Sequence, residues 1–260
     1  MVNLQDTCCL DISFDPDSNS LLFNDQVTPT ESRKIMLKNL TPALLNKNLT
    51  YPRQVYEEYI QVSHIEDVEI MQKGFYYDLI CLPSGLLGVE FIKSHVYYSP
   101  LSDDRISTLV EVHLGTLTVI MQKNKPRGEY DFHTEVDEGL LVTLRRGEKL
   151  AIPQGYFYTF INTEESPAVF VRMHRGHDII DYSLIQKERG LAYYAIRKNA
   201  RLEVVLNPVY RGIPKIKKIK PENTLTPFLY RLNKIALYAT QRRHWKIRRN
   251  HYRGTYIDMQ

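Results

Sequence analysis

Side chains that could bind a divalent metal ion gather between residues 90 and 133 of this 260-residue chain. Imidazole and carboxylate groups are among the ligands that such ions take in proteins. Glu111 and His113 are two residues apart in a run that alternates like a strand, so they share one face. Leu109 shares that face, and Thr108 lies on the opposite one. The candidate ligands are Glu90, His95, Glu111, His113 and His133. They form either a metal site or a scattered set of surface and core residues, and the sequence favours the second reading.

Basic residues are concentrated at the end of the chain. From residue 209 onwards there are 13 Lys and Arg against two acids, whereas the first 208 residues carry 21 basic and 28 acidic residues. An acidic body with a basic tail indicates a partner. The tail residues of interest are Arg242, Arg243, Trp245, Lys246, Arg248 and Arg249.

Three readings of this tail stay open. Cations interleaved with aromatic rings suit nucleic acid, because cations neutralise phosphates and aromatic rings stack on bases. The same pattern on an amphipathic helix suits an anionic membrane surface. The third reading is a helix that packs its apolar face on the body and lays its charges against acidic residues, a protein partner or a second subunit.

The elements that position these residues are mostly strands. Residues 147–162 read as a strand, a turn and a strand, because Pro153 and Gly155 separate a short apolar run from a run of aromatic and branched residues. Many further short strands indicate a barrel or a sandwich. The remaining predicted strands are Phe75–Leu82, Gly88–Tyr98, Thr108–Leu114, Thr116–Gln122, Leu140–Leu144, Ala168–Met173, Leu191–Ile196 and Arg201–Leu206.

The chain divides into three parts. Residues 1–20 are polar and irregular, which predicts an N-terminal arm, either loose or an edge strand. Residues 21–212 form the barrel domain, with helical spacing at 31–49 and an exposed hairpin loop at 123–139. Residues 213–260 are a basic linker followed by an amphipathic helix that begins at Thr226 and Pro227.

The segment 147–162 resembles the second signature motif of the cupin β-barrels, which has the frame G-x5-P-x-G-x2-H-x3-N. Gly147, Pro153, Gly155 and Asn162 match that frame. Tyr158 stands where cupins have a metal-binding histidine. The resemblance implies an all-β fold, a single cupin (jelly-roll-like) β-barrel with helical additions on the N-terminal side and at the C-terminus.

Within the cupins, the chain is similar to the archaeal-type phosphoglucose isomerases from about residue 49 to residue 211. Four stretches carry this likeness, and they are Val55–Tyr59, Gly88–Ser94, the frame above, and Gly176–Asp178 with Asn207–Pro208 further on. That family is metal-dependent and interconverts glucose 6-phosphate and fructose 6-phosphate. Its metal polarises the sugar oxygens while a carboxylate moves the proton.

The resemblance places the family's three metal-binding histidines and one glutamate on Tyr97, Ser99, Thr108 and Tyr158. Neutral hydroxyl groups are poor ligands for such ions. We therefore expect no cofactor and a degenerate metal site, in which the two phenols fill the space of the ion. A divalent metal is expected only if the site has shifted, or if the alignment between His95 and Thr108 is displaced by a residue or two.

Part of a sugar-phosphate pocket is retained under the same resemblance. Tyr56 stands where the family has a tyrosine near the sugar, and Ser94 keeps a hydroxyl of the phosphate-binding run. His177 keeps the histidine that follows the last barrel strand. These three are the candidate substrate-binding residues, and the alternative is that they are structural remnants.

The bulk composition is that of an ordinary globular protein, with 43% hydrophobic and 25% charged residues. We expect no transmembrane segment and no secretory signal. Three cysteines cannot form a disulfide framework, so we expect a cytoplasmic location. Like the family that it resembles, the protein is expected to be a homodimer.

The sequence thus supports three hypotheses. The first is a catalytically degenerate relative of the cupin phosphoglucose isomerases that binds a sugar phosphate or small anion without metal, as a sensor or regulator with a basic partner-binding tail. The second is an active glucose-6-phosphate isomerase with a shifted metal site. The third is a scaffold without a ligand, or a nucleic-acid-binding protein. Whether the chain is an enzyme stays open at this point.

Overall fold

The computed structural model describes residues 1–68, 76–101, 106–125, 135–175, 180, 185, 187–225 and 235–240. Strands dominate these residues, and the helical elements between them are short turns of three or four residues. The predicted all-β fold class is therefore confirmed. No helix among the described residues is long and apolar enough to cross a membrane.

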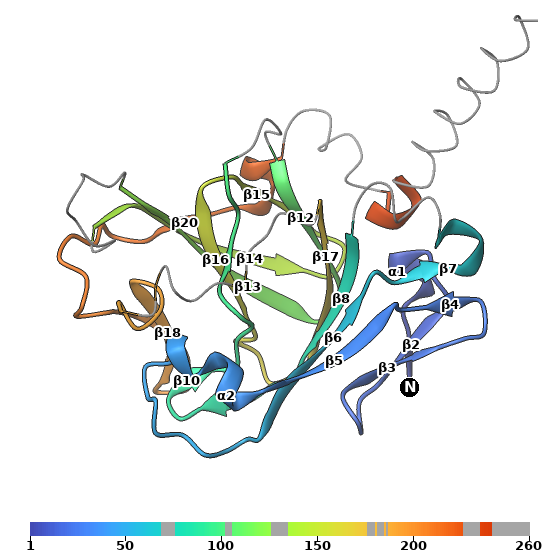
Figure 1. Ribbon diagram of the computed structural model, residues 1–260, viewed down its shortest axis with the longest axis horizontal. Coiled ribbons are helices and arrows are strands. Elements are labelled where there is room, and N and C mark those ends of the chain that lie inside the picture. Colours follow the sequence, from blue (N-terminus) through green and yellow to red (C-terminus); the bar gives the residue numbers. More distant parts are fainter. Residues whose placement is uncertain are drawn as a thin grey trace, which may run out of the picture.

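A six-stranded antiparallel sheet forms one wall of a barrel (Figure 1). Its order is β15 (Lys149–Pro153), β12 (Ile106–Leu114), β17 (Ala168–His174), β8 (Tyr76–Leu82), β6 (Gln54–Ile60) and β5 (Glu31–Met36). Successive side chains of a strand point to opposite faces. One set of residues therefore points into the barrel, and the other lies on the outer face of this sheet.

A five-stranded sheet forms the opposite wall. Its order is β11 (Tyr97–Tyr98), β16 (Tyr156–Ile161), β13 (Thr116–Asn124), β14 (Val136–Arg145) and β20 (Lys217–Ile219). Apolar side chains of both walls meet in one buried cluster, with Val110 and Val112 from β12 and Leu117 and Val119 from β13. Side chains therefore fill this part of the barrel, which makes it a packed core.

Two glycine turns fix the connections near the site. The predicted strand–turn–strand unit is confirmed as β15, a turn and β16. Gly155 in that turn has a φ of 81° and donates a 2.6 Å backbone hydrogen bond to Ser99. Gly115 joins β12 to β13 with a φ of 72°, and a Cβ there would lie 2.3 Å from the carbonyl oxygen of Pro167. Only glycine fits that position.

The N-terminal residues cover the outer face of the six-stranded sheet. They form β1 (Val2–Asn3), α1 (Gln5–Cys8), β2 (Ile12–Asp15), β3 (Ser20–Phe23) and β4 (Val27–Thr28), and β4 pairs with β7 (Ser63–His64). Ile12 and Phe14 are buried with Leu79 and Val171 of β8 and β17. Residues 1–20 are therefore not a loose arm, because their apolar side chains bury one face of a small sheet against the barrel.

The helical prediction for residues 31–49 is wrong over its first part. Glu31–Met36 is strand β5, and only α2 (Leu37–Leu40) and a 3-10 turn, η1 (Thr41–Ala43), are helical. Ile35 pairs with Tyr56 of β6 and packs in the barrel core. The ladder with β6 supplies the backbone hydrogen bonds of this segment, and that tertiary pairing outweighs the helical spacing of its apolar residues.

A four-stranded sheet packs beside the barrel in the order β19 (Arg201–Leu206), β18 (Tyr193–Lys198), β10 (Glu90–Phe91) and β9 (Leu86–Leu87). The predicted single strand Gly88–Tyr98 is therefore divided between this sheet and β11. The chain must cross from one sheet to the other, and buried Ile92 and Val96 lie in the crossing segment.

The C-terminal part is attached to the barrel in two places. Lys217–Ile219, expected to be linker, is strand β20, because it pairs in parallel with β14 and Ile219 packs against the barrel core. The 3-10 turn η4 (Pro221–Thr224) follows, and η2 (Ile65–Asp67) is the corresponding short turn after β7. Leu237 and Tyr238 are buried on the outer face of the six-stranded sheet. The predicted helix start at Thr226 lies outside the described residues.

Candidate functional site

Polar side chains line the barrel interior beyond its apolar core. Phe170 and Ile80 point inward, and the next inward residues on their strands are Arg172 and Asp78, which are cross-strand partners. Thr108 of β12 pairs with His174 of β17 at the following level. Glu58 of β6 and the phenols of Tyr56, Tyr97 and Tyr158 complete the set, and every one of these residues is buried.

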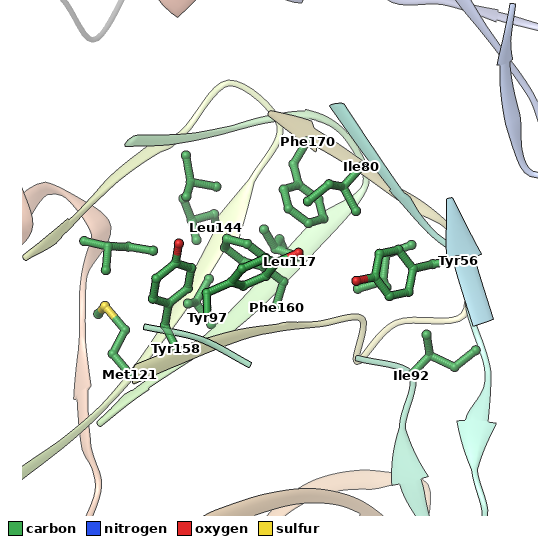
Figure 2. Close-up of a cluster of buried hydrophobic side chains, with 14 of the residues drawn as sticks. Tyr56, Ile80, Ile92, Tyr97, Leu117, Met121, Leu144, Tyr158, Phe160 and Phe170 are labelled. Carbon is green, nitrogen blue, oxygen red and sulfur yellow. The ribbon is translucent and has the colours of Figure 1, made fainter. Parts of the chain in front are cut away.

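Two phenol rings occupy the centre of this group. Tyr97 and Tyr158 are cross-strand partners on β11 and β16, and their rings stack with centroids 5.3 Å apart (Figure 2). Both residues have no solvent exposure. The guanidinium carbon of Arg172 lies 4.2 Å from the centre of the Tyr97 ring, within the range of a cation–π contact. The hydroxyls of Tyr158 and Thr108 are 3.4 Å apart.

The Glu58 side chain accepts hydrogen bonds from two phenols. The Tyr97 hydroxyl donates to the Glu58 carboxylate at 2.6 Å and the Tyr56 hydroxyl at 3.0 Å. The Tyr56 oxygen in turn accepts a 3.1 Å bond from the backbone N–H of His95. Burial, together with the nearby carboxylate of Glu58, raises the pKa of both phenols well above their ordinary value. The phenols are therefore neutral donors, and the side chain of Glu58 accepts from both.

A second carboxylate, Asp78, binds the cationic side of the site. Its Oδ2 accepts a 2.9 Å hydrogen bond from Arg172 and lies 2.8 Å from Nε2 of His174. Burial would raise the pKa of Asp78, but the hydrogen bond of His174 and the charge of Arg172 outweigh burial and lower it to about 2. The ring of Tyr76 stacks on His174 with centroids 5.2 Å apart, which orients the imidazole.

His95 also belongs to the barrel interior. Its ring lies edge-on to Tyr56 and Tyr97, at centroid distances of 6.2 and 6.3 Å. Burial lowers the pKa of His95, although the Glu58 carboxylate opposes the shift, so the imidazole is neutral near pH 7. His95, one of the candidate metal ligands, is thus buried in the barrel close to Tyr97 and Glu58.

Three of the four predicted metal positions come together in space, namely Tyr97, Thr108 and Tyr158. Ser99 is buried further along the same segment, where its backbone N–H donates to Tyr156. The candidate substrate residue Ser94 is 1% exposed, and its Oγ accepts a 3.0 Å bond from the Phe160 N–H. His177 and the six named residues of the tail lie outside the described residues.

Glu111 and His113 lie on the outer face, as their parity with Leu109 predicts. Glu111 pairs with Lys149 at 2.8 Å, and Nε2 of His113 lies 3.2 Å from the Tyr77 hydroxyl. Glu90 forms a buried pair with Lys93, and His133 is not described. Within the described part of the chain, no three His, Cys, Asp or Glu side chains are close enough together to hold a metal ion. The candidate ligands predicted from the sequence therefore do not form a metal site within the described residues.

Sequence reasoning missed four residues of this cluster, which are Glu58, Asp78, Arg172 and His174. The alternation of inward-facing and outward-facing residues along a strand could have identified them. Glu58 is two residues after Tyr56 on one strand, so both share the inward face. Arg172 and His174 follow inward Phe170 in the same way, but a charged residue in a strand is more often read as exposed.

The site lies within a segment that matches a known protein family. Residues 40–209, more than half of the chain, match the family model of glucose-6-phosphate isomerase (GPI). No curated protein matches the sequence.

Solved structures of low identity resemble parts of the chain. Peruvianin-I, a cysteine peptidase from Thevetia peruviana latex, is 16% identical with a TM-score of 0.29, covering 42% of this chain and 56% of that one. An oxalate decarboxylase of Lactobacillus farciminis is 11% identical with a TM-score of 0.35, covering 50% and 32%. A vicilin from Capsicum annuum is 14% identical with a TM-score of 0.34, covering 52% and 33%. The chain thus spans between about a third and about half of these structures.

The family match includes the strands from β6 to β19 and every residue of the buried polar cluster described above. The family expected from the four sequence stretches is the one found. The chain belongs to the cupin-type glucose-6-phosphate isomerase family.

Proposed function

We propose that this protein is a metal-independent, non-catalytic member of its family that binds a sugar phosphate in the barrel. Its polar barrel interior serves recognition, and the interconversion of aldose and ketose is lost. A sugar phosphate is the ligand class because the family model describes a glucose-6-phosphate isomerase.

The observation that carries the proposal is the Tyr97–Tyr158 stack beside Arg172. The resemblance assigns the metal to Tyr97, Ser99, Thr108 and Tyr158. A raised pKa keeps Tyr97 a neutral phenol, which is a poor ligand. The permanently charged guanidinium repels a divalent cation at short range. These groups do not fit a divalent metal ion.

Buried charge supports a ligand over a purely structural barrel. Glu58, Asp78 and Arg172 are each at most 5% exposed, and removing such groups from water is costly. Apolar side chains of similar volume would fill a scaffold at lower cost. His95 and His174 are the most exposed members of the cluster, at 7% and 6%, and we assign them the contacts with the sugar phosphate.

A scaffold without a ligand is the second candidate, and one observation favours it. Tyr97 and Tyr158 are fully buried against each other, and the hydroxyls of Tyr56 and Ser94 already bond within the protein. Hydroxyl groups that already bond within the protein need no ligand for stability.

Thermal unfolding in the presence of EDTA distinguishes the two candidates. Fructose 6-phosphate should raise the midpoint of the wild-type protein, since a ligand that binds only the folded state stabilises it. Fructose without phosphate should raise it less. The variant His95→Gln should lose most of the shift, whereas His64→Gln, at a partly exposed histidine outside the barrel, should keep it. An unchanged midpoint at saturating fructose 6-phosphate would favour the scaffold.

A further inference from the structure

We propose that a cleft beside α2 binds a phosphate monoester with an apolar or aromatic body, such as a nucleoside monophosphate. The cleft has a volume of about 330 Å³, within the range of small-molecule sites. Residues of α2 and of the segment before β6 line it, outside the barrel interior. Figure 1 shows α2 near the edge of the molecule. Its lining residues are Met36, Leu37, Lys38, Thr41, Leu49, Thr50 and Arg53.

The positive charge of the cleft favours an anionic ligand. Lys38 and Arg53 are both exposed, and neither forms an ion pair with any described carboxylate. No acidic residue lines the cleft. Lys34, on neighbouring β5, differs because it already pairs with Glu57 at 3.7 Å. Two cations without counter-charges on one small cleft favour a phosphate group, which an arginine can bind through two parallel hydrogen bonds.

The cleft also has fixed walls and an available donor. The backbone N–H of Leu37 donates a 2.8 Å hydrogen bond to the carbonyl of Arg53, which holds α2 against the segment before β6. The Thr41 hydroxyl already donates a hydrogen bond to the carbonyl of Leu37, so it is not the available donor. The exposed Thr50 hydroxyl makes no hydrogen bond to any described residue. It can therefore donate to a phosphate oxygen.

The apolar floor sets the rest of the ligand. Leu37 is 5% exposed, Leu49 packs against the barrel core, and Met36 is half-buried. A free phosphate or a hydrophilic sugar phosphate leaves this floor in water. A ring or chain that covers the floor gains the free energy of apolar burial. The cleft therefore fits a phosphate joined to a planar base or another apolar group.

The test is an NMR titration of the full-length protein with adenosine 5′-monophosphate as the probe, followed by backbone amide shifts. We expect shifts at residues 37–41 and 49–53, and weaker binding of ribose 5-phosphate, inorganic phosphate and adenosine. Lys38→Ala and Arg53→Ala should each weaken binding about tenfold, because each removes a charged contact. Lys34→Ala is the matched control and should bind like the wild type.

Three results would overturn the proposal. The first is an absence of shifts in these segments at millimolar adenosine 5′-monophosphate. The second is equal binding by Lys38→Ala, Arg53→Ala and the wild-type protein. The third is equal affinity for ribose 5-phosphate and the nucleotide, which would show that the apolar floor does not contribute to binding. Binding of fructose 6-phosphate in the barrel is a separate property, and Lys38→Ala should leave it unchanged.

Discussion

The guanidinium of Arg172 lies over the ring of Tyr97 inside the barrel, 4.2 Å from its centre. Arg172 also donates to Asp78, and Tyr97 donates to Glu58. The two residues therefore connect both buried carboxylates in one network. In our proposal this network occupies the place of a metal ion, so the same contacts that stabilise the barrel also prevent the family's chemistry.

The Glu58 hydrogen bond should make a measurable contribution to stability. Tyr97→Phe keeps the stacked ring but removes the hydroxyl that donates to Glu58 at 2.6 Å. Leaving a buried carboxylate with one donor fewer costs about 1–3 kcal/mol in the free energy of unfolding. Tyr98→Phe is the matched control, since the Tyr98 hydroxyl bonds to no described residue. Urea unfolding of both variants measures the difference, and equal stabilities would contradict the network.

Asp78 should make the protein sensitive to acid in a defined range. Its pKa falls from 3.8 in the unfolded chain to about 2 in the fold. A carboxyl group with a lowered pKa stabilises the fold above the unfolded value, and this contribution is lost as the pH falls through the folded value. We expect the free energy of unfolding to fall by about 2 kcal/mol between pH 4 and pH 2.

Unfolding measured at several pH values checks this expectation. In Asp78→Asn the slope of stability against pH between 4 and 2 should be smaller than in the wild type. The variant is also less stable at pH 7, because Arg172 loses its buried counter-charge. An unchanged slope would show that Asp78 is not the titrating group.

The fold could be predicted from the sequence further than the site could. The motif around Gly155 predicts strands β15 and β16, since glycine and proline allow few alternatives there. By contrast, the spacing of the apolar residues in β5 favours a helix, and only the pairing of β5 with β6 makes it a strand.

The site was predicted in part. Tyr97, Thr108 and Tyr158 meet as the resemblance implies. Asp78 and Arg172 were missed because no motif marks them, and their pairing depends on the register of β8 against β17. Charged side chains of this kind become recognisable only when two distant strands are aligned.

Lys149 should be important for stability on the outer face of the barrel. Its ammonium group lies 2.8 Å from the Glu111 carboxylate, and both side chains are at most 5% exposed. Burial already raises the pKa of Glu111 in spite of this lysine. Lys149→Met leaves a buried charge without its partner, which costs about 3–5 kcal/mol at pH 7.

The effect of Lys149→Met should decrease toward pH 5. A raised folded-state pKa means that Glu111 binds its proton more readily in the fold, so stability declines as the pH rises above the unfolded value. Lys34→Met, at an exposed lysine, should leave stability nearly unchanged at both pH values. A pH-independent loss in Lys149→Met would argue against a charge effect.

The basic tail can be separated from the docked segment that precedes it. Leu237 donates its backbone N–H to Glu111, and Tyr238 donates its hydroxyl to Asp67, so residues 235–240 are part of the fold. Deleting residues 241–260 should keep the unfolding midpoint. If the tail binds nucleic acid, this deletion should also abolish salt-sensitive retention on DNA or RNA.

Deletion of residues 235–260 is the comparison for the tail. It removes the buried Leu237 and Tyr238 and should lower the unfolding midpoint. Retention on nucleic acid that survives deletion of 241–260 would place the binding surface elsewhere.

An isomerase assay tests whether this protein has lost the catalytic activity of its family. Protein purified without chelator is incubated with fructose 6-phosphate, alone and with added manganese, iron, nickel or zinc, and glucose 6-phosphate is measured. Circular dichroism on the same sample shows that the protein is folded. We expect no turnover above the uncatalysed rate with any metal. Turnover that a chelator abolishes would contradict this expectation and establish an active metal-dependent isomerase.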